Sequence, residues 1–332
     1  MTDALWPGLA VAGNAYSMGL RPDAGVPRFT ARDVMDRAIH LQLSGVELPV
    51  RMLDGADIEE LRAYAGEQGL FVTVDTDGFD PEKLAGVVET ATRIGSPTVR
   101  TVIGGAKIGG DRRPLAGRWK PFLDEVAAGL RKATVAAEQA GVNLAVENHQ
   151  DLASEELLWL CESIDSPYFG INLDAANPLA TAEEPVDFFR RVAPYVKNVH
   201  LKDYWIWLSE EGYRLVRCPI GQGIVDFPLM LETLDAAVPG VSMSIELAAL
   251  EARHIRVFAD DFWPDYPVRT PAQFAAALRV VLANARAGGD WRTPFEREES
   301  GEAIAAYERR QLEQSVAYVR TLQATRPGKE VG

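Results

Sequence analysis

The sequence predicts an α/β fold, a (β/α)8 TIM barrel with a C-terminal helical extension. Short apolar runs alternate with longer amphipathic segments eight times in order along the chain. That alternation is typical of βα units arranged around a parallel sheet. Runs such as VNLAVE, FGINLD and SMSIEL are almost continuously apolar, as strands buried on both faces should be. Eight consecutive units favour a closed barrel over a doubly wound open sheet.

The eight predicted strands share a short apolar run that ends beside polar or glycine residues. They are Leu9–Tyr16, Gly45–Val50, Phe71–Asp75, Thr98–Gly104, Asn143–Asn148, Gly170–Asp174, Asn198–Lys202 and Ser242–Leu247.

The predicted helices have apolar residues at helical spacing, and several follow an Asp, Ser or Thr that can cap the first turn. They are Ala31–Gln42, Ile58–Gln68, Pro81–Ile94, Phe122–Ala140, Glu155–Ser163, Val186–Ala193, Pro228–Ala237 and Pro271–Ala287. The predicted caps are Thr30, Asp80, Ser154 and Thr270.

The chain of 332 residues is longer than the roughly 250 residues of a typical barrel, so additions are expected. We assign residues 1–288 to a catalytic barrel and residues 289–332 to a linker and helical appendage. Two insertions, 202–227 and 248–268, follow the seventh and eighth strands at the end of the barrel where active sites form. Their Trp and Tyr residues suit either a substrate wall or lid, or a small local core.

The overall composition limits the binding partners and the cellular compartment that we expect for this protein. A formal charge of −14 would repel phosphate backbones, so no nucleic-acid partner is expected. Neither Cys161 nor Cys218 lies in a metal-binding pattern, so both should be reduced thiols, as in a cytoplasmic protein. The N-terminus lacks the features of a signal peptide, and no apolar run is long enough for a membrane span.

Four charged or polar side chains follow apolar runs at the ends of strands five to eight. They are Glu147, Asp174, His200 and Glu246. Because strand ends converge in a barrel, these groups can meet, and the three carboxylates would repel each other unless a cation joined them. Mn²⁺ or Mg²⁺ suits this ligand set best, with Co²⁺ or Zn²⁺ as alternatives. The competing interpretation is that each residue has its own structural role.

These residues and the segments ENH, NLDAAN, VHLKD and GQGIVDF resemble the xylose isomerase-like TIM-barrel superfamily, also called sugar phosphate isomerases/epimerases. The resemblance covers roughly Leu9 to Ala287. It implies that the four strand-end residues are metal ligands. It also implies that Glu147 and Glu246 act as general acid and base on opposite faces of the substrate.

The chemistry implied is proton transfer next to a carbonyl. A carboxylate removes the proton, and the metal stabilises the enediolate that forms. Return of the proton to the other face epimerises a keto-sugar or keto-polyol, and return to the neighbouring carbon isomerises it. A substrate with a leaving group β to the carbonyl would undergo elimination instead.

His149 departs from the epimerase pattern. It lies two residues after Glu147 and is similar to a histidine in dehydratases and carbon–glycoside-cleaving lyases of this superfamily. We expect it to contact substrate as an acid, a base or a hydrogen-bond donor, or to support a ligand. The alternative function is therefore a lyase, either an inosose-type dehydratase or the catalytic subunit of a C-glycoside deglycosidase that acts on 3-keto-glycosides.

Five further residues are candidate substrate contacts because they lie at strand ends or in the insertions. They are Lys202, Arg217, Asn14, Glu47 and His254. Each has a structural alternative, such as a salt bridge at the rim or a solvated loop histidine.

Other classes fit less well. With 4 histidines, the chain lacks the many metal-binding histidines of the abasic-site endonucleases in this superfamily. A sugar-binding regulatory barrel remains a non-enzymatic alternative. The expected partners are a small carbohydrate or polyol and further copies of the chain in a homo-oligomer, or a small partner subunit in a hetero-oligomer, with no membrane.

Overall fold

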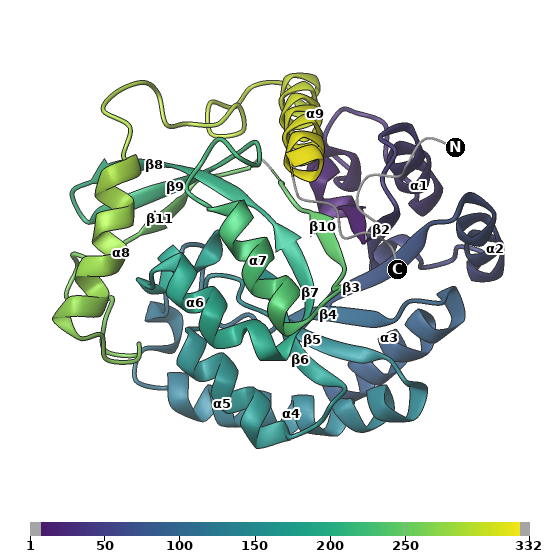
Figure 1. Cartoon of the computed structure of the whole chain (residues 1–332), viewed down its shortest axis with the longest axis horizontal. Helices are drawn as coiled ribbons and strands as arrows, with labels where there is room; N and C mark the ends of the chain where they lie inside the picture. The colour runs from purple at the N-terminus through teal and green to yellow at the C-terminus, as the bar shows by residue number, and fades with distance from the viewer. Residues whose placement is uncertain (1–7, 249, 326–332) are drawn as a thin grey trace.

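Eight parallel strands close into a barrel in the computed structural model, which describes residues 8–248 and 250–325 (Figure 1). Around the barrel the strands follow the order β1-β10-β7-β6-β5-β4-β3-β2, so the chain's first and last barrel strands pair and close it. The barrel strands are β1 (Leu9–Ala12), β2 (Gly45–Pro49), β3 (Phe71–Asp77), β4 (Thr98–Val102), β5 (Asn143–Glu147), β6 (Phe169–Asp174), β7 (Val196–Leu201) and β10 (Met243–Ile245). The predicted barrel is confirmed.

Helices surround the barrel. They are α1 (Ala31–His40), α2 (Ile58–Gln68), α3 (Pro81–Ile94), α4 (Trp119–Ala140), α5 (Ser154–Ile164), α6 (Pro185–Val192), α7 (Phe227–Ala237) and α8 (Pro271–Asn284). The side chains of Thr30, Asp80 and Thr270 cap their helices as predicted. Ser154 does not. The N-cap is Ala153, and the Ser154 hydroxyl instead hydrogen-bonds to Glu183.

The first predicted strand is too long. β1 ends at Ala12, and residues Gly13–Leu20 form the 3-10 helical segment η1. A side chain at Gly13 would lie 2.8 Å from the Pro49 ring, so the backbones approach closely where the strand stops. Apolar composition alone could not distinguish this buried turn from a continued strand.

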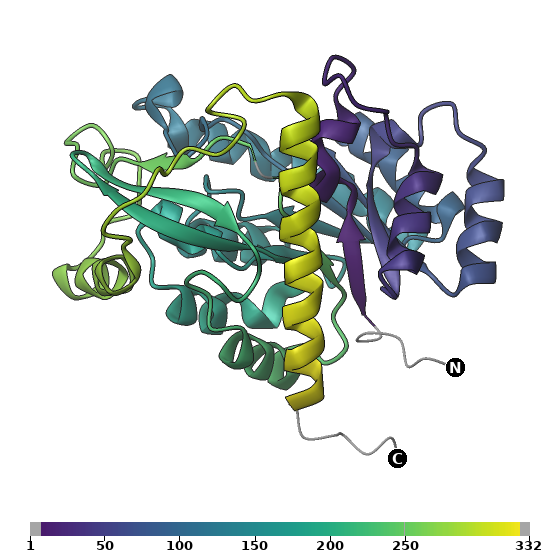
Figure 2. The ribbon, with the colours of Figure 1, turned by 90° about the horizontal axis from the view of Figure 1, so that it is seen from above.

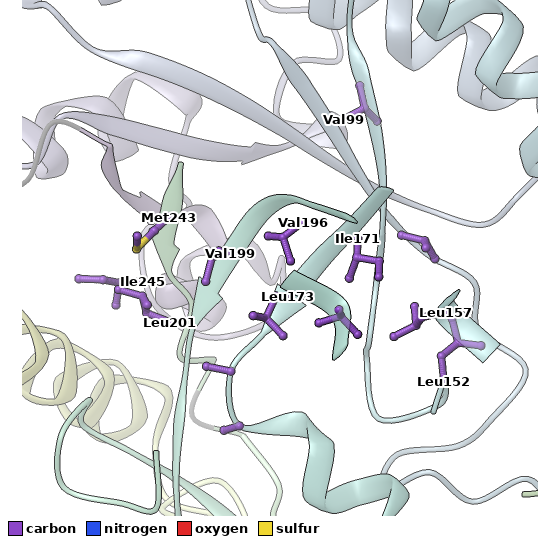
Figure 3. Close-up of a cluster of buried hydrophobic side chains, with 14 of the residues drawn as sticks. Val99, Leu152, Leu157, Ile171, Leu173, Val196, Val199, Leu201, Met243 and Ile245 are labelled. Atoms are coloured by element: carbon purple, nitrogen blue, oxygen red, sulfur yellow. The ribbon is translucent and has the colours of Figure 1, made fainter. Parts of the chain in front are cut away.

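The core follows the alternation of apolar strands and amphipathic helices. Figure 3 shows part of it, where Val199 of β7, Leu173 and Ile171 of β6 and Leu157 of α5 belong to one buried cluster. All four side chains are fully buried. This continuous apolar packing holds the carboxyl ends of the strands in fixed relative positions.

The two insertions form a second sheet rather than an irregular loop. β8 (Asp203–Ser209) and β9 (Gly212–Cys218) make an antiparallel hairpin, and β11 (Arg253–Ile255) pairs with β9. Along β8, Tyr204 and Trp205 point to opposite faces because strand residues alternate. Tyr204 hydrogen-bonds to residues of the barrel mouth, whereas Arg286, just after α8, lies over the Trp205 ring at 4.0 Å from its centroid. One face of the hairpin therefore lies toward the barrel mouth, and the other belongs to a local outer core.

The C-terminal helix α9 (Gly301–Thr325) stands against the barrel beside η1 (Figure 2). Its Glu308 side chain accepts hydrogen bonds from the Ser17 hydroxyl and from the Met18 backbone. The Gln311 amide donates to the Arg217 carbonyl at 3.2 Å. The helix thus connects η1, which follows the first barrel strand, with β9 of the second sheet.

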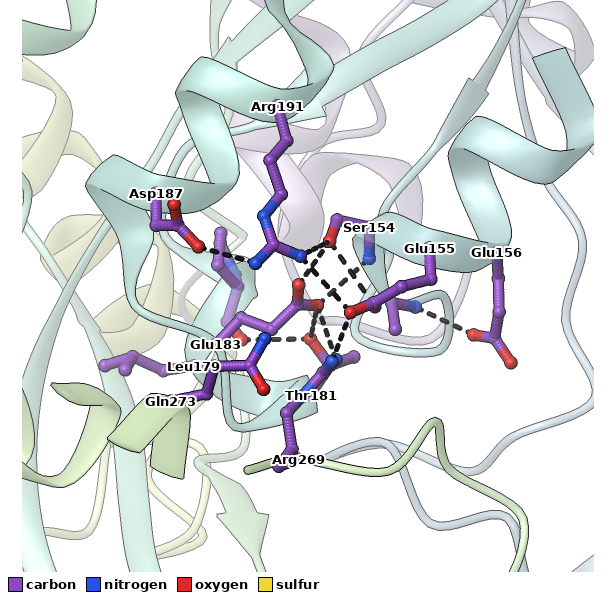
Figure 4. Close-up of polar contacts among 12 residues, drawn as sticks. Ser154, Glu155, Glu156, Leu179, Thr181, Glu183, Asp187, Arg191, Arg269 and Gln273 are labelled. Carbon is purple, nitrogen blue, oxygen red and sulfur yellow. Dashed lines mark hydrogen bonds and ion pairs between the residues drawn. The ribbon is translucent and has the colours of Figure 1, made fainter. Parts of the chain in front are cut away.

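A polar network outside the barrel anchors the end of the second insertion (Figure 4). The buried Arg269 guanidinium contacts Glu155 at 2.6 Å and Glu183 at 3.1 Å, and Glu183 accepts from Ser154. These contacts tie the segment before α8 to α5 and to the chain before α6. Within the described ranges, no helix combines the length and apolar character needed to cross a membrane.

Candidate metal centre and catalytic site

Three of the four predicted ligands converge at the carboxyl end of the barrel. Glu147 and Asp174 are the last residues of β5 and β6, and His200 on β7 lies opposite Asp174 in the strand register. One ligand atom from each of the three lies within 4.8 Å of the others, and all three side chains are fully buried. Their spacing is suited to one cation.

Glu246, the fourth predicted ligand, is joined to this group through Lys202. The buried Lys202 ammonium donates to Asp174 and also contacts the Glu246 carboxylate. Burial alone would lower the pKa of Lys202, but these two carboxylates raise it above its usual value. Burial would raise the pKa of Glu246, yet Lys202 and then His200 hold it well below its usual range. Lys202 therefore stays charged and Glu246 ionised.

The donor atoms fit a divalent ion. Glu147 Oε1 and His200 Nδ1 are buried and have no hydrogen-bond partner among the described residues, while Glu147 Oε2 and Glu246 Oε2 have ion pairs with Arg100 and Lys202 but no hydrogen bond. Buried polar atoms without hydrogen bonds are costly, which favours a ligand at this position. Carboxylate oxygens together with one imidazole suit Mn²⁺, Mg²⁺ or Zn²⁺.

Glu47 lies beneath this group and orients His200. Its carboxylate is 2.7 Å from His200 Nε2 and accepts a 3.1 Å hydrogen bond from the Asn198 amide. Burial opposes ionisation, but His200 and Arg100 lower the pKa of Glu47 to about 2. A contact at Nε2 leaves Nδ1 facing Glu147 at 3.5 Å, the arrangement by which carboxylates orient metal-binding imidazoles. Glu47 is fully buried in the middle of β2, and the structure shows it in contact with the predicted ligand His200.

Arg100 is a central member of the site that the sequence analysis did not select. Its guanidinium lies 2.7 Å from Glu147 and 3.8 Å from both Glu47 and Asp75. Burial raises the pKa of Asp75 to about 7 in spite of Arg100. A charged residue inside a barrel strand was the available signal in the sequence.

His149 is more accessible than the predicted ligands. It follows β5 and is partly exposed, whereas Glu147 is fully buried. Surrounding protein atoms, and next the charge of Lys202, lower the pKa of His149 to about 3. A neutral imidazole at this position can share a hydrogen bond with a bound molecule.

The ENHQ segment is held by hydrogen bonds that fix the adjacent strand end. The Asn148 side chain accepts from the Asp174 backbone N–H at 2.6 Å and donates to its carbonyl at 3.0 Å. Gln150 donates to the Tyr204 hydroxyl, which itself donates to Asn177 at 3.0 Å. These amides keep β5, β6 and the second sheet in register.

Two of the remaining substrate candidates lie on opposite faces of the second sheet. Arg217 on β9 is buried and faces the barrel mouth on the same side as Tyr204, which lies opposite it in the register. His254 lies opposite Arg214 and its ring is 2.8 Å from the Ser209 hydroxyl, so it faces away from the site. The expected contact between His254 and substrate is not supported, because neighbouring β11 residues point to opposite faces. Asn14 falls within η1, and its side chain lies outside the described part of the chain.

Asp203, directly after Lys202, closes the GQG loop. Its carboxylate accepts backbone hydrogen bonds from Gly221, Gly223, Ile224 and Val225 at 2.7–3.2 Å. Burial raises the pKa of Asp203 to about 6, against the effect of those hydrogen bonds. The loop N–H groups therefore occupy both carboxylate oxygens of Asp203.

Comparison with known proteins agrees with this architecture. Residues 35–261 match the family model described as xylose isomerase-like TIM barrel. The chain is 27% identical over 199 residues to a 3-oxo-isoapionate decarboxylase of Pectobacterium atrosepticum, covering 59% of this chain and 68% of that protein.

Solved structures show the same fold at low sequence identity. A xylose isomerase-like TIM-barrel protein from Mycobacterium smegmatis in complex with magnesium has a TM-score of 0.58 and 14% identity, covering 85% of this chain and 98% of that one. The IolI protein with a bound zinc atom has a TM-score of 0.56 and 14% identity, covering 83% and 99%.

Proposed function

The chain belongs to the xylose isomerase-like TIM-barrel family, and from that membership and its buried ligand cluster we propose a function. We infer a divalent-metal-dependent enzyme of the sugar isomerase or epimerase type. It removes a proton next to the carbonyl of a keto-sugar or keto-polyol and passes through an enediolate. The observation that carries this proposal is the convergence of Glu147, Asp174 and His200, with Glu246 linked to them by Lys202.

Glu147, Asp174, His200 and Glu246 would hold the ion. When bound there, a divalent cation polarises a carbonyl and stabilises the negative charge of an enediolate. The relatives with magnesium and zinc support the choice of a divalent ion. Mn²⁺ is our first candidate because the ligand set is rich in carboxylates.

Glu147 and Glu246 are the proposed acid and base. β5 and β10 are separated by β6 and β7 around the barrel, so the two carboxylates approach its centre from different sides. That arrangement allows one carboxylate to remove a proton and the other to return it on the opposite face. The Lys202 ammonium, between Asp174 and Glu246, is placed to hydrogen-bond to a substrate oxygen as negative charge develops.

A lyase is the second candidate, and two observations favour it. His149 follows Glu147 by two residues and is partly exposed, where its imidazole could hydrogen-bond to a leaving group. The relative from Pectobacterium atrosepticum is named as a decarboxylase of a 3-oxo acid. Loss of CO2 from a 3-oxo acid gives an enolate, as proton removal does, so the same cluster would serve either reaction.

The experiment follows both reactions in one assay. The Mn²⁺-loaded protein is incubated in D2O with ketoses, inososes, 3-keto-glycosides and 3-oxo sugar acids, and products are followed by NMR. Deuterium uptake at one carbon without loss of a substituent supports the isomerase or epimerase. Release of water, an aglycone or CO2 supports the lyase.

Two variants test the assigned roles. Glu246→Gln should weaken Mn²⁺ binding and abolish exchange, because it removes a ligand and a base. His149→Ala should reduce turnover far more than Mn²⁺ affinity. Activity that is indifferent to chelation and to added metal would refute the proposed function.

A further inference from the structure

Two arginines face the barrel mouth from the second sheet, in a chain of strongly negative net charge. Arg217 on β9 and Arg253 on β11 are 4% and 5% exposed. Arginine is seldom this buried unless its charge is paired. We therefore expect a negatively charged partner for these two arginines.

The strand register places both guanidinium groups on one face. Arg253 lies opposite Leu215, and Leu215 is two residues from Arg217 along β9. Residues two apart on a strand share a face, so Arg253 and Arg217 are diagonal neighbours, within reach of one another for long side chains. Tyr204, opposite Arg217, completes this face toward the barrel mouth.

The two arginines lack a buried carboxylate partner within the described residues. One Arg217 Nη donates to the Ala248 carbonyl, and one Arg253 Nη donates to the Glu251 carbonyl at 3.1 Å. The nearest carboxylate to Arg253 is that of the part-exposed Glu251, at 3.8 Å. Both Nε atoms are buried without a hydrogen-bond partner. Burial and the charge of Arg217 lower the pKa of Arg253 to about 10.

The carboxylates of the metal centre are already in contact with other cations. Arg100 already contacts Glu147, and Lys202 already contacts Asp174 and Glu246. A divalent ion at the centre would add positive charge rather than remove it. The missing group is therefore an anion that enters the site from outside.

A carboxylate fits this position better than a phosphate ester. Phosphate sites at this end of a TIM barrel use free backbone N–H groups in the loops after the seventh and eighth strands. Here the N–H groups of Gly221, Gly223 and Ile224 all donate to the Asp203 carboxylate. Two guanidinium groups on the same face of the sheet offer planar forks that match a carboxylate.

We propose that Arg217 and Arg253 bind a carboxylate of the substrate, so that the enzyme acts on a keto-sugar acid rather than a neutral keto-sugar. This inference rests on the proposed function for the identity of the site. Arg217 lies opposite Tyr204, whose hydroxyl hydrogen-bonds to Asn177 at the barrel mouth, so a carboxylate bound by the two arginines lies on the face of the second sheet that is turned toward the site.

The test compares molecules that differ at one carbon. Binding of 2-keto-D-gluconate, D-fructose and D-fructose 1-phosphate to the full-length Mn²⁺-loaded protein is measured by calorimetry. These molecules carry a carboxylate, a hydroxymethyl group and a phosphate ester at the same position. We expect the acid to bind at least about tenfold more tightly than D-fructose, as two charge-assisted contacts should provide.

Variants test whether the preference for the acid over D-fructose depends on Arg253. Arg253→Met should reduce it to less than about threefold, because a fork and a charge are lost. Arg214→Met is the matched control, since Arg214 lies on β9 facing outward over the Trp291 ring, and it should keep the preference. Arg253→Lys, which retains the charge, replaces Arg253→Met if that variant shows no cooperative unfolding transition.

The outcomes separate the two proposals, because the binding assay needs no turnover. Equal affinity for the acid and for D-fructose, a preference for the phosphate ester, or a preference that survives Arg253→Met would each overturn the carboxylate site. A preference for the acid that depends on Arg253 supports it even if no deuterium exchange is observed, in which case the proposed reaction alone fails.

Discussion

Removal of Lys202 should destabilise the metal-free protein and increase its stabilisation by a divalent ion. The Lys202 ammonium is fully buried and contacts two buried carboxylates, those of Asp174 and Glu246. Removal of one member of a buried ion pair costs roughly 3–5 kcal/mol, because the remaining charge is left unpaired. With each kcal/mol worth about 2 °C in a protein of this size, Lys202→Met should lower the melting temperature by about 6–10 °C.

The ion should restore much of this loss. An ion present at 100 times its dissociation constant stabilises a folded protein by about 2.7 kcal/mol. In Lys202→Met the two freed carboxylates attract the ion more strongly, so the increase in melting temperature on Mn²⁺ addition should exceed that of the unaltered protein. Differential scanning calorimetry of chelated protein, with and without Mn²⁺, measures both effects.

Lys83→Met is the matched control. Lys83 pairs with Asp77 at the surface, where the side chains are 45% and 74% exposed, and such pairs contribute less than about 1 kcal/mol. The reasoning would be refuted if metal-free Lys202→Met unfolded within about 1 kcal/mol of the unaltered protein, since a buried pair should cost more. It would also fail if Mn²⁺ stabilised both proteins equally.

Three further predictions concern other parts of the molecule. Burial raises the pKa of Glu308 to about 7, so the folded state holds a proton that the unfolded chain loses near pH 4.5. The stability that the protonated Glu308 contributes is complete below pH 4.5 and is lost as pH rises through 7. The free energy of unfolding of Glu308→Gln, measured in urea, should therefore rise by about 3 kcal/mol relative to that of the unaltered protein between pH 4.5 and 8. Parallel pH curves of the two proteins would contradict this. Arg269→Met should lower the free energy of unfolding by roughly 3–5 kcal/mol in the same assay, because it leaves Glu183 buried without its cation. A loss below about 1 kcal/mol would show that this ion pair contributes little to stability. His254→Ala should leave kcat/KM within about twofold and cost only about 1 kcal/mol through its lost contact with Ser209, whereas a tenfold fall in kcat/KM would place His254 in the site.

Most of the fold was predictable because each barrel unit is locally encoded. Apolar runs identified the strands, and Thr30, Asp80 and Thr270 marked helix starts through their own side chains. The boundary of β1 was missed because η1 is as buried and apolar as a strand. The second sheet was missed because β11 pairs with β9 only through the tertiary structure, across more than thirty residues of chain.

The site was predictable where strand order determines it. Glu147, Asp174 and His200 lie at the carboxyl ends of consecutive strands, His200 one residue before the end of its own, so a closed barrel must bring them together. Arg100 was not among the predicted site residues, because its contact with Glu147 is made between side chains of two neighbouring strands, β4 and β5.

In the second insertion, His254 and Arg253 could not be told apart as site residues from the sequence. Which of two neighbouring β11 residues faces the mouth depends on a pairing register that the sequence does not mark.

The central claim is that one divalent ion binds to Glu147, Asp174, His200 and Glu246. The most direct measurement is calorimetric titration of chelated full-length protein with Mn²⁺, together with elemental analysis of the loaded protein. We predict one ion per chain, with binding abolished or strongly weakened in Asp174→Asn and unchanged in Glu82→Gln, which alters a surface residue of α3. No ion uptake, or equal uptake by the unaltered protein and Asp174→Asn, would contradict the claim.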